Sequence, residues 1–245
     1  NWRGKPMIGW LGERVVDWKR FRGDKQASYS TPVAATVNGE RQIFCLMRQG
    51  LVSLNPANGT VNFSYWFRAM VDESVNAISP IVVDDLVFIS GAYYRIGSAL
   101  LKILPGNQSV EPVWRGTSLE IHWTTPIYHN GYLYGLSGRN EPDARFRCVE
   151  FKTGKVMWER DERWRHGIEP ATYGRGSAIL AEGKLIVLGE TGLLGLFRVN
   201  PEKPEELSRA QLPLKYPCWT APILSNKRLY IRSENKLLCL DLARP

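Results

Sequence analysis

The sequence predicts an all-β fold, a β-propeller built from four-stranded antiparallel blades. A Ser/Thr/Ala-Pro-Val/Ile unit recurs at Pro32, Pro80, Pro126 and Pro222, and a degenerate copy lies around Ala178. These anchors are 48, 46, 52 and 44 residues apart. A repeat of this size with strand-like content in every unit is typical of propeller blades. The repeats cover approximately 30–67, 76–116, 122–160, 175–210 and 219–245, so we expect about five blades in a single domain, 1–245.

Each repeat alternates short apolar strands with turn residues. In the first repeat we expect strands over 32–37, 41–47, 51–54 and 61–67. The dipeptide Asn38-Gly39 is a tight hairpin signal between the first two strands, and Asn130-Gly131 takes the same place in the third repeat. No helical period of useful length occurs anywhere, which argues against an α/β enzyme fold.

The last repeat ends after its third strand, at 239–242, so its fourth strand must come from elsewhere. We expect the chain to be the C-terminal part of a seven- or eight-bladed ring. The alternative is a closed five-bladed ring, in which the segment 15–21 around Trp18 completes the last blade.

A large aromatic residue recurs near the end of each repeat. Phe63, Trp114 and Trp158 take this position, and Trp18 is the aromatic of a blade whose earlier strands are absent. An aromatic ring at a fixed blade position can wedge between neighbouring blades and bury much of its area there. We therefore assign these four residues a structural docking role.

Composition sets broad limits on function. The 245 residues are 44% hydrophobic, which suits one sizeable globular core, and the formal net charge is +8. No apolar run is long enough to span a membrane, and no nucleic-acid motif is present, so we expect no nucleic-acid partner. The four cysteines lie far apart and are expected to be buried thiols.

The repeats resemble the tryptophan-docking repeats of the quinoprotein-like β-propellers. The segment 148–158 is the closest copy, with Glu150, Thr153, Gly154 and Trp158 on the key positions of the pattern Ala-x-Asp-x-x-Thr-Gly-x-x-x-Trp. The resemblance covers nearly the whole chain from Trp18 onward. That superfamily includes dehydrogenases that bind pyrroloquinoline quinone with calcium. It also includes non-enzymatic members, such as the lipoprotein scaffold of the outer-membrane barrel-assembly machinery, so fold alone does not decide function.

The catalytic constellation that the resemblance would imply is not recognisable. Quinone dehydrogenases of this type combine a calcium site, a catalytic Asp and, in many members, a disulfide between adjacent cysteines, and no adjacent cysteines occur here. Asp72, Glu73, Glu120 and Glu169 lie near the lead-in loops, but none sits in a matching motif. We therefore predict no catalytic, cofactor-binding or metal-binding residue.

A binding site would lie where the loops that enter the first strands converge, on the axial face of the propeller. We expect its candidate ligand-binding residues to be Tyr29, Asn76, His122, Trp123, Tyr173, Arg175 and Trp219. Tryptophans at this position can bind a carbohydrate or a peptide, and they can equally plug the central channel.

The hypothesis that these observations favour is a non-catalytic scaffold that binds a protein or polysaccharide partner, in the periplasm or outside the cell. The alternative is an alcohol or sugar dehydrogenase dependent on pyrroloquinoline quinone and calcium, with its cofactor site partly in missing N-terminal blades. The sequence predicts no transmembrane segment and leaves the oligomeric state open.

Overall fold

The fold is a succession of antiparallel sheets. The computed structural model describes residues 28–69, 74–164 and 171–243. Within these ranges the strands form four sheets of four strands and one sheet of three, each in sequential order. Helical structure in the described residues is limited to two 3-10 turns, η1 (Tyr93–Arg95) and η2 (Glu141–Asp143). The all-β prediction is confirmed.

The strands follow one another along the chain in five groups. The first sheet holds β1 (Val33–Val37), β2 (Glu40–Met47), β3 (Gly50–Leu54) and β4 (Val61–Trp66). The second holds β5 (Ile81–Val83), β6 (Leu86–Gly91), β7 (Gly97–Ile103) and β8 (Val110–Gly116). The third holds β9 (Ile127–His129), β10 (Tyr132–Ser137), β11 (Arg145–Glu150) and β12 (Val156–Asp161). The fourth holds β13 (Ser177–Ala181), β14 (Lys184–Leu188), β15 (Leu193–Arg198) and β16 (Glu205–Gln211), and the fifth holds β17 (Ile223–Ser225), β18 (Arg228–Arg232) and β19 (Leu237–Asp241).

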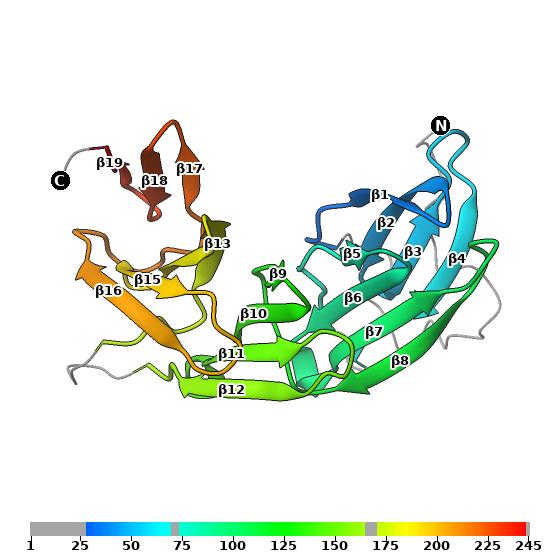
Figure 1. Cartoon of the computed structure of the whole chain (residues 1–245), viewed down its shortest axis with the longest axis horizontal. Helices are drawn as coiled ribbons and strands as arrows, with labels where there is room; N and C mark the ends of the chain where they lie inside the picture. Colours follow the sequence, from blue (N-terminus) through cyan, green and yellow to red (C-terminus); the bar gives the residue numbers. More distant parts are fainter. Residues whose placement is uncertain (1–27, 70–73, 165–170, 244–245) are drawn as a thin grey trace.

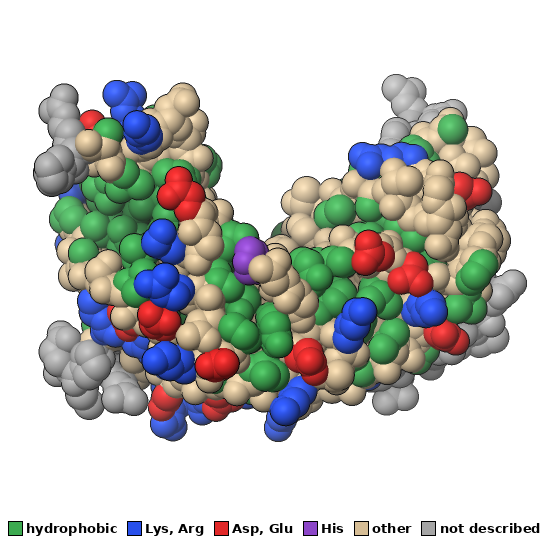
Figure 2. Space-filling view, viewed as in Figure 1, with side chains coloured by type: hydrophobic (Ala, Val, Ile, Leu, Met, Phe, Trp, Pro, Cys, Tyr) green, Lys and Arg blue, Asp and Glu red, His purple; other side chains and the backbone are tan. Residues whose placement is uncertain are grey.

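The sheets lie side by side in an open arc, with the first and the fifth sheets at its two ends (Figure 1). The first strand of each sheet faces the hollow of the arc, and β4, β8, β12 and β16 lie on its outer side (Figure 1). Figure 2 shows the same crescent in space-filling form, with positive and negative side chains interspersed along its outer side. The segment 15–21, expected either to finish an upstream blade or to close the ring, lies outside the described residues.

Local turn chemistry sets the register of each sheet. The hairpin between the first and second strands begins with a residue of positive φ in all five sheets: Asn38 (48°), Asp84 (54°), Asn130 (47°), Glu182 (48°) and Asn226 (49°). Turns of this kind match the twist of the flanking strands, and Asn and Asp tolerate them best. In the four four-stranded sheets, the pairing of the third and fourth strands shifts register once, as at Ser53/Leu54 and Cys148/Val149.

The hydrophobic core lies between adjacent sheets. One cluster joins the first three sheets through side chains such as Phe44, Phe88 and Leu133. A second joins the third and fourth sheets around Phe146 and Phe197, and a third joins the fourth and fifth sheets. The second, third and fourth sheets therefore pack against a neighbour on each side, which is the packing expected of propeller blades.

The cysteine prediction was partly wrong. Cys45, Cys148 and Cys218 are buried thiols, but Cys239 on β19 is exposed. β19 pairs only with β18 among the described strands, and its side chains alternate between half-buried and exposed. Among the described residues, no helix has the length and apolar character needed to cross a bilayer.

Two tryptophans on outer strands reach across to the next sheet. Trp114 on β8 donates its indole N–H to the carbonyl of Phe151 at 2.9 Å, and Trp158 on β12 donates to the carbonyl of Asn200 at 2.8 Å. Both rings are partly buried, whereas Phe63 on β4 is buried and packs on Phe44 with ring centroids 6.3 Å apart. Trp18, expected to take the same role, lies outside the described residues.

Candidate functional site

Two sets of loops share one end of the sheets. In a four-stranded antiparallel sheet, the loop that enters the first strand and the loop between the second and third strands emerge at the same end. The loops 117–126 and 212–222 are of the first kind, and η1 and the segment 189–192 are of the second. We call this end the axial face, because the first strands line the hollow of the arc.

The axial face carries a continuous run of aromatic side chains, here called the aromatic strip. Its seven rings are Tyr94, Tyr93, His122, Trp123, Trp219, Tyr216 and Trp164, in order of contact. Successive ring centroids are 6.3, 5.0, 4.7, 5.3, 5.7 and 5.0 Å apart, all in tilted or edge-to-face arrangements. These are the favourable geometries for aromatic pairs. The strip therefore joins loops from four consecutive sheets into one surface.

Two guanidinium groups lie over rings of the strip. Arg139 lies 4.5 Å from the ring centroid of Tyr93 and 4.7 Å from that of Tyr94, and Arg175 lies 4.6 Å from that of Trp123. Cation–π contacts of this length are attractive and become stronger when the pair is shielded from water. Both arginines therefore pack against rings of the strip and stabilise their positions.

A buried ion pair lies beneath the strip. Arg175 and Glu190 are only 7% and 1% exposed. The guanidinium donates two hydrogen bonds to the carboxylate, from Nη2 to Oε1 at 2.9 Å and from Nε to Oε2 at 3.2 Å. The backbone N–H of Arg175 donates to the same carboxylate at 2.9 Å. Gly174, at φ +62°, brings the chain so close that a Cβ there would lie 2.6 Å from Glu190 Oε2. The pair is thus fixed by both side chains and backbone.

Trp219 is the exposed member that this pair positions. Its indole N–H donates to Glu190 Oε1 at 2.9 Å, while 48% of the residue remains exposed. Tyr216, 43% exposed, meets its ring edge-on. A large aromatic ring on the surface is usually free to change rotamer, but this one is held by a buried carboxylate. The indole of Trp219 is therefore both exposed and held in one orientation.

His122 is held in its neutral form. Burial first, and then the positive charges of Arg175 and Arg139, lower the pKa of His122 to about 4. Its Nδ1 atom and the Nε1 atom of Trp123 are buried without a hydrogen-bond partner among the described residues. The centre of the strip therefore stays uncharged at neutral pH and retains two unused polar atoms.

The structure brings four of the predicted binding residues together, namely His122, Trp123, Arg175 and Trp219. The other three lie in different surroundings. Tyr29 is 75% exposed, and its backbone N–H donates to Asn76 O at 3.2 Å. Asn76 is 3% exposed and uses its amide to bind the carbonyls of Met47 and Phe67, each at 3.0 Å. Tyr173 is fully buried and donates its hydroxyl to Glu206 at 2.8 Å.

Several members of the site were not foreseen from the sequence. Tyr93, Tyr94, Arg139 and Glu190 come from loops between the second and third strands, and the sequence argument considered only the loops that enter the first strands. The signal was available, because hairpin topology alone places both kinds of loop at the same end of a blade. Trp164 and Tyr216 were missed because they lie several residues before a first strand.

The residues that the structure describes do not form a site for a calcium-bound quinone. Among the described residues, no three or more His, Cys, Asp or Glu side chains gather where they could hold a metal ion. Of the acids near the lead-in loops, Glu120 lines a separate pocket, and Asp72, Glu73 and Glu169 lie outside the described residues. The charged pair on the axial face, Arg175 and Glu190, is occupied internally. We derive no chemical step through such a cofactor.

The sequential four-stranded sheets, with their shared cores and tryptophan contacts, define a quinoprotein-like β-propeller. The family model described as outer membrane protein assembly factor BamB matches residues 12–160, and the chain belongs to this family. The resemblance inferred from the repeats is confirmed.

Solved structures match the fold. The crystal structure of BamB from Moraxella catarrhalis aligns with a TM-score of 0.59 at 15% sequence identity, over 86% of this chain and 56% of that one. This chain therefore spans about half the length of that protein, and the likeness concerns the fold alone. No match was found among the curated proteins.

Proposed function

We propose that this chain is a non-catalytic propeller scaffold that binds a protein partner through the aromatic strip. The observation that carries the proposal is Trp219, an exposed indole whose N–H is fixed on a buried carboxylate at 2.9 Å. An exposed apolar ring that the fold holds rigid is suited to contact a binding partner. It loses little conformational entropy when a partner covers it.

The composition of the strip supports a protein partner. Binding hot spots are enriched in Trp, Tyr and Arg, and they cluster in rigid, well-packed patches. The strip contains three tryptophans and three tyrosines, with Arg139 and Arg175 packed on their rings. The family supports the same interpretation, since the matching model is described as an assembly factor.

The arrangement of charges supports a role without catalysis. A catalytic group must reach substrate with an available proton or lone pair. On the axial face, Arg175 and Glu190 form hydrogen bonds with each other, with the backbone and with Trp219. The unused Nδ1 atom of His122 is buried, and the rings of Tyr93 and Trp123 pack against the imidazole, which keeps it from a substrate on the surface.

We propose that the protein acts in the cell envelope. The family description names outer membrane assembly, and the solved BamB shares the fold. Binding to one component of an envelope assembly is therefore the form of partner recognition that we propose.

The test compares two exposed aromatic residues on the same chain. Tagged wild type, Trp219→Ala and Tyr29→Ala are used to capture proteins from envelope extracts. Each captured protein is then purified and titrated against the three forms. Trp219→Ala should weaken binding by at least about tenfold, as expected for a hot-spot residue. Tyr29→Ala, which removes an even more exposed ring outside the strip, should bind like the wild type.

Two outcomes would overturn the proposal. One is equal affinity of Trp219→Ala and wild type for every captured protein. The other is the absence of any envelope protein that binds the wild-type chain in purified form.

A further inference from the structure

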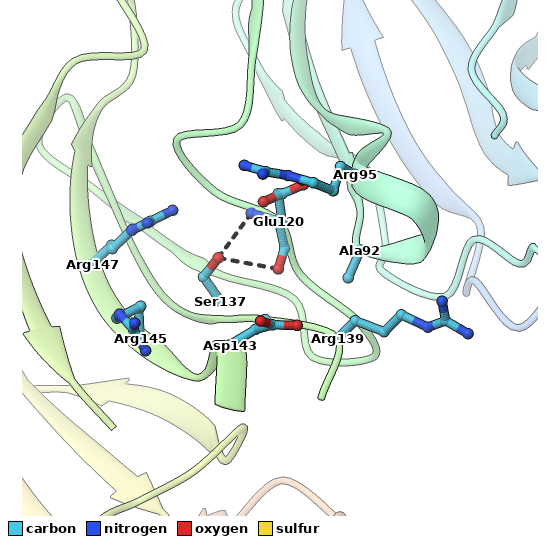
Figure 3. A pocket seen from close by; sticks show the side chains of 9 residues that line it. Ala92, Arg95, Glu120, Ser137, Arg139, Asp143, Arg145 and Arg147 are labelled. Carbon is cyan, nitrogen blue, oxygen red and sulfur yellow. Dashed lines mark hydrogen bonds and ion pairs between the residues drawn. The ribbon is translucent and has the colours of Figure 1, made fainter. Parts of the chain in front are cut away.

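A polar pocket lies beside the aromatic strip, between the second and third sheets. Its volume is about 260 Å³, and it is lined by Ala92, Arg95, Glu120, Ser137, Gly138, Arg139, Asp143, Arg145 and Arg147. Figure 3 shows the guanidinium groups of Arg95 and Arg147 on the side of Glu120, while Arg139 points away from it. The guanidinium of Arg139 lies instead over the rings of Tyr93 and Tyr94. The pocket is therefore distinct from the strip but shares Arg139 and η1 with it.

The donors of the pocket wall are fixed in place. Arg147 donates through Nε to Glu159 at 2.7 Å and through Nη1 to the carbonyls of Thr117 and Ser118 at 3.1 and 3.0 Å. Arg145 lies 3.3 Å from Glu159 through Nε and donates through Nη1 to Ala144 O at 2.8 Å. The hydrogen bonds and ion pairs of both guanidinium groups with described residues run through Nε and Nη1, and none involves Nη2. The Nη2 atom of each arginine is thus a donor in a fixed position that can bind a ligand.

The carboxylate of Glu120 in the pocket lining has a long ion pair but no hydrogen-bond donor at Oε1 among the described residues. The side chain of Glu120 is 17% exposed, and its Oε1 atom is buried without a hydrogen-bond partner among the described residues. Among the described residues, the charged group that pairs with Oε1 is Arg95, with its Nε atom 3.9 Å away, and the side chain of Arg95 is itself 79% exposed. Ser137 holds Glu120 only through backbone atoms, accepting from its N–H at 3.0 Å and donating to its carbonyl at 3.1 Å. A buried acceptor left without a donor costs free energy that a suitable ligand recovers.

The rim of the pocket is strained. Tyr94 and Arg95, next to each other in η1, both have positive φ, at 50° and 57°. Such backbone conformations cost free energy for residues other than glycine and occur often at ligand sites. The guanidinium of Arg95 belongs to the pocket lining, whereas the neighbouring ring of Tyr94, 44% exposed, packs on Arg139.

The charges are close to balance. Glu120 and Asp143 lie in the lining, and Glu159 already neutralises the Nε side of Arg145 and Arg147. A carboxylate or phosphate ligand would accept from the arginines, but it would leave Glu120 Oε1 unpaired and add negative charge beside two carboxylates. A hydroxyl both donates and accepts. Neighbouring hydroxyls can accept from the fixed arginines and donate to Glu120 and Asp143 at the same time.

We propose that this pocket binds a neutral sugar residue through neighbouring hydroxyl groups. The volume supports a ligand of this size. Pockets that hold drug-sized ligands have volumes of ~300–1,000 Å³, and this pocket is slightly smaller. The site takes one residue at the mouth of the pocket, so the ligand is a monosaccharide or a terminal unit of a glycan. This inference is independent of the protein partner proposed above.

The test uses saturation-transfer and chemical-shift NMR on the full chain with methyl α-glucoside, methyl α-mannoside and methyl α-galactoside. At least one should bind with millimolar affinity, the range expected for so small a polar ligand. Sodium acetate and inorganic phosphate serve as comparison probes. Glu120→Ala should weaken binding about tenfold by removing a charged hydrogen-bond acceptor. Among the described residues, this change removes no side-chain hydrogen bond at Oε1 and one long ion pair, the 3.9 Å contact with the exposed Arg95.

Arg95→Ala provides a second variant, since its exposed side chain plays little part in folding, and it should weaken binding several-fold. Arg198→Ala is the matched control: it removes another exposed arginine, paired only with Glu205, on a different sheet. Binding of acetate or phosphate without any sugar would overturn the proposal, and so would the absence of binding by all three glycosides. Sugar binding that survives both Glu120→Ala and Arg95→Ala would place the sugar elsewhere and refute the assignment.

Discussion

The indole N–H of Trp114 donates to the carbonyl of Phe151 at 2.9 Å, across the boundary between the second and third sheets. The ring also lies against Gly154, three residues further along the same turn. One sheet later, Trp158 repeats the hydrogen bond with Asn200 O at 2.8 Å. The last strand of one blade is thus bonded to the turn before the last strand of the next. This contact links the repeat pattern of the sequence to the curvature of the arc.

Replacing Trp158 should destabilise the chain strongly. The ring packs on Phe146 at a centroid distance of 5.1 Å and on Tyr134 at 6.1 Å, so Trp158→Ala removes packing as well as the hydrogen bond. We expect a loss of about 3–5 kcal/mol in the free energy of unfolding, measured in urea. Trp158→Phe keeps most of the packing and should lose about 1 kcal/mol. An unchanged unfolding curve for Trp158→Ala would show that the blade contact is misassigned.

Gly154 allows a separate test of the close approach to Trp114. Its φ is +72°, and an added Cβ would lie 2.8 Å from the Trp114 ring. Gly59→Ala is the matched control, since Gly59 has φ +74° and open space around the position. Both variants incur backbone strain of about 1 kcal/mol, and Gly154→Ala should lose a further 1–2 kcal/mol through the ring contact. Equal thermal melts for the two variants would contradict the contact.

The sequence predicted the features that local chemistry determines. Asn38-Gly39 and Asn130-Gly131 form hairpins because few dipeptides tolerate positive φ at both positions. Trp114 and Trp158 lie against the next sheet because the repeat places an aromatic residue at the same point of each blade. The expected strands agree with the observed ones within about two residues at their ends.

Features that depend on contacts between distant residues could not be predicted in this way. Tyr173 belongs to an entry loop, yet its hydroxyl reaches Glu206 in a space that the missing side chain of Gly195 leaves open. Nothing local to Tyr173 indicates this space. The pairing of Arg175 with Glu190 likewise joins residues 15 positions apart on different loops. The pocket around Glu120 needs side chains from two sheets at once.

The Arg175–Glu190 pair should behave as a buried ion pair. Glu190→Gln keeps an acceptor for the indole of Trp219 but leaves the Arg175 guanidinium uncompensated. We expect a loss of about 3 kcal/mol in unfolding free energy, with a change in tryptophan fluorescence as Trp219 loosens. Adding Arg175→Met to Glu190→Gln should recover part of the loss, because the unpaired charge is then removed.

The control for this pair is Glu205→Gln, which breaks the solvent-exposed contact with Arg198. Surface pairs contribute little, so its unfolding curve should overlay that of the wild type. If the unfolding curve of Glu190→Gln also overlaid that of the wild type, the pair would not position Trp219. The rigid contact surface proposed for partner binding would then lose its support.

The last prediction concerns pH and the buried carboxyl of Glu162. Burial raises the pKa of Glu162 to about 7, against the opposing effects of Arg160 and of the Tyr173 N–H. Its carboxylate pairs with Arg160 at 3.0 Å and accepts from Tyr173 N at 2.8 Å, and Glu206 and Arg209 complete the surrounding charges. A raised carboxyl pKa means that the folded chain holds this proton more tightly than the unfolded chain does. The contribution of Glu162 to stability is therefore fully present below about pH 4.5 and is lost as the pH rises through 7.

Glu162→Gln removes this titration while keeping the size of the side chain. The unfolding free energy of wild type relative to Glu162→Gln should therefore fall by on the order of 2–3 kcal/mol between pH 4.5 and pH 8. Glu202→Gln, in an exposed turn, is the control and should leave the pH profile unchanged. Urea unfolding at half-unit pH steps measures the difference directly. A relative stability that rises with pH instead would mean that Arg160 outweighs burial and holds Glu162 ionised throughout.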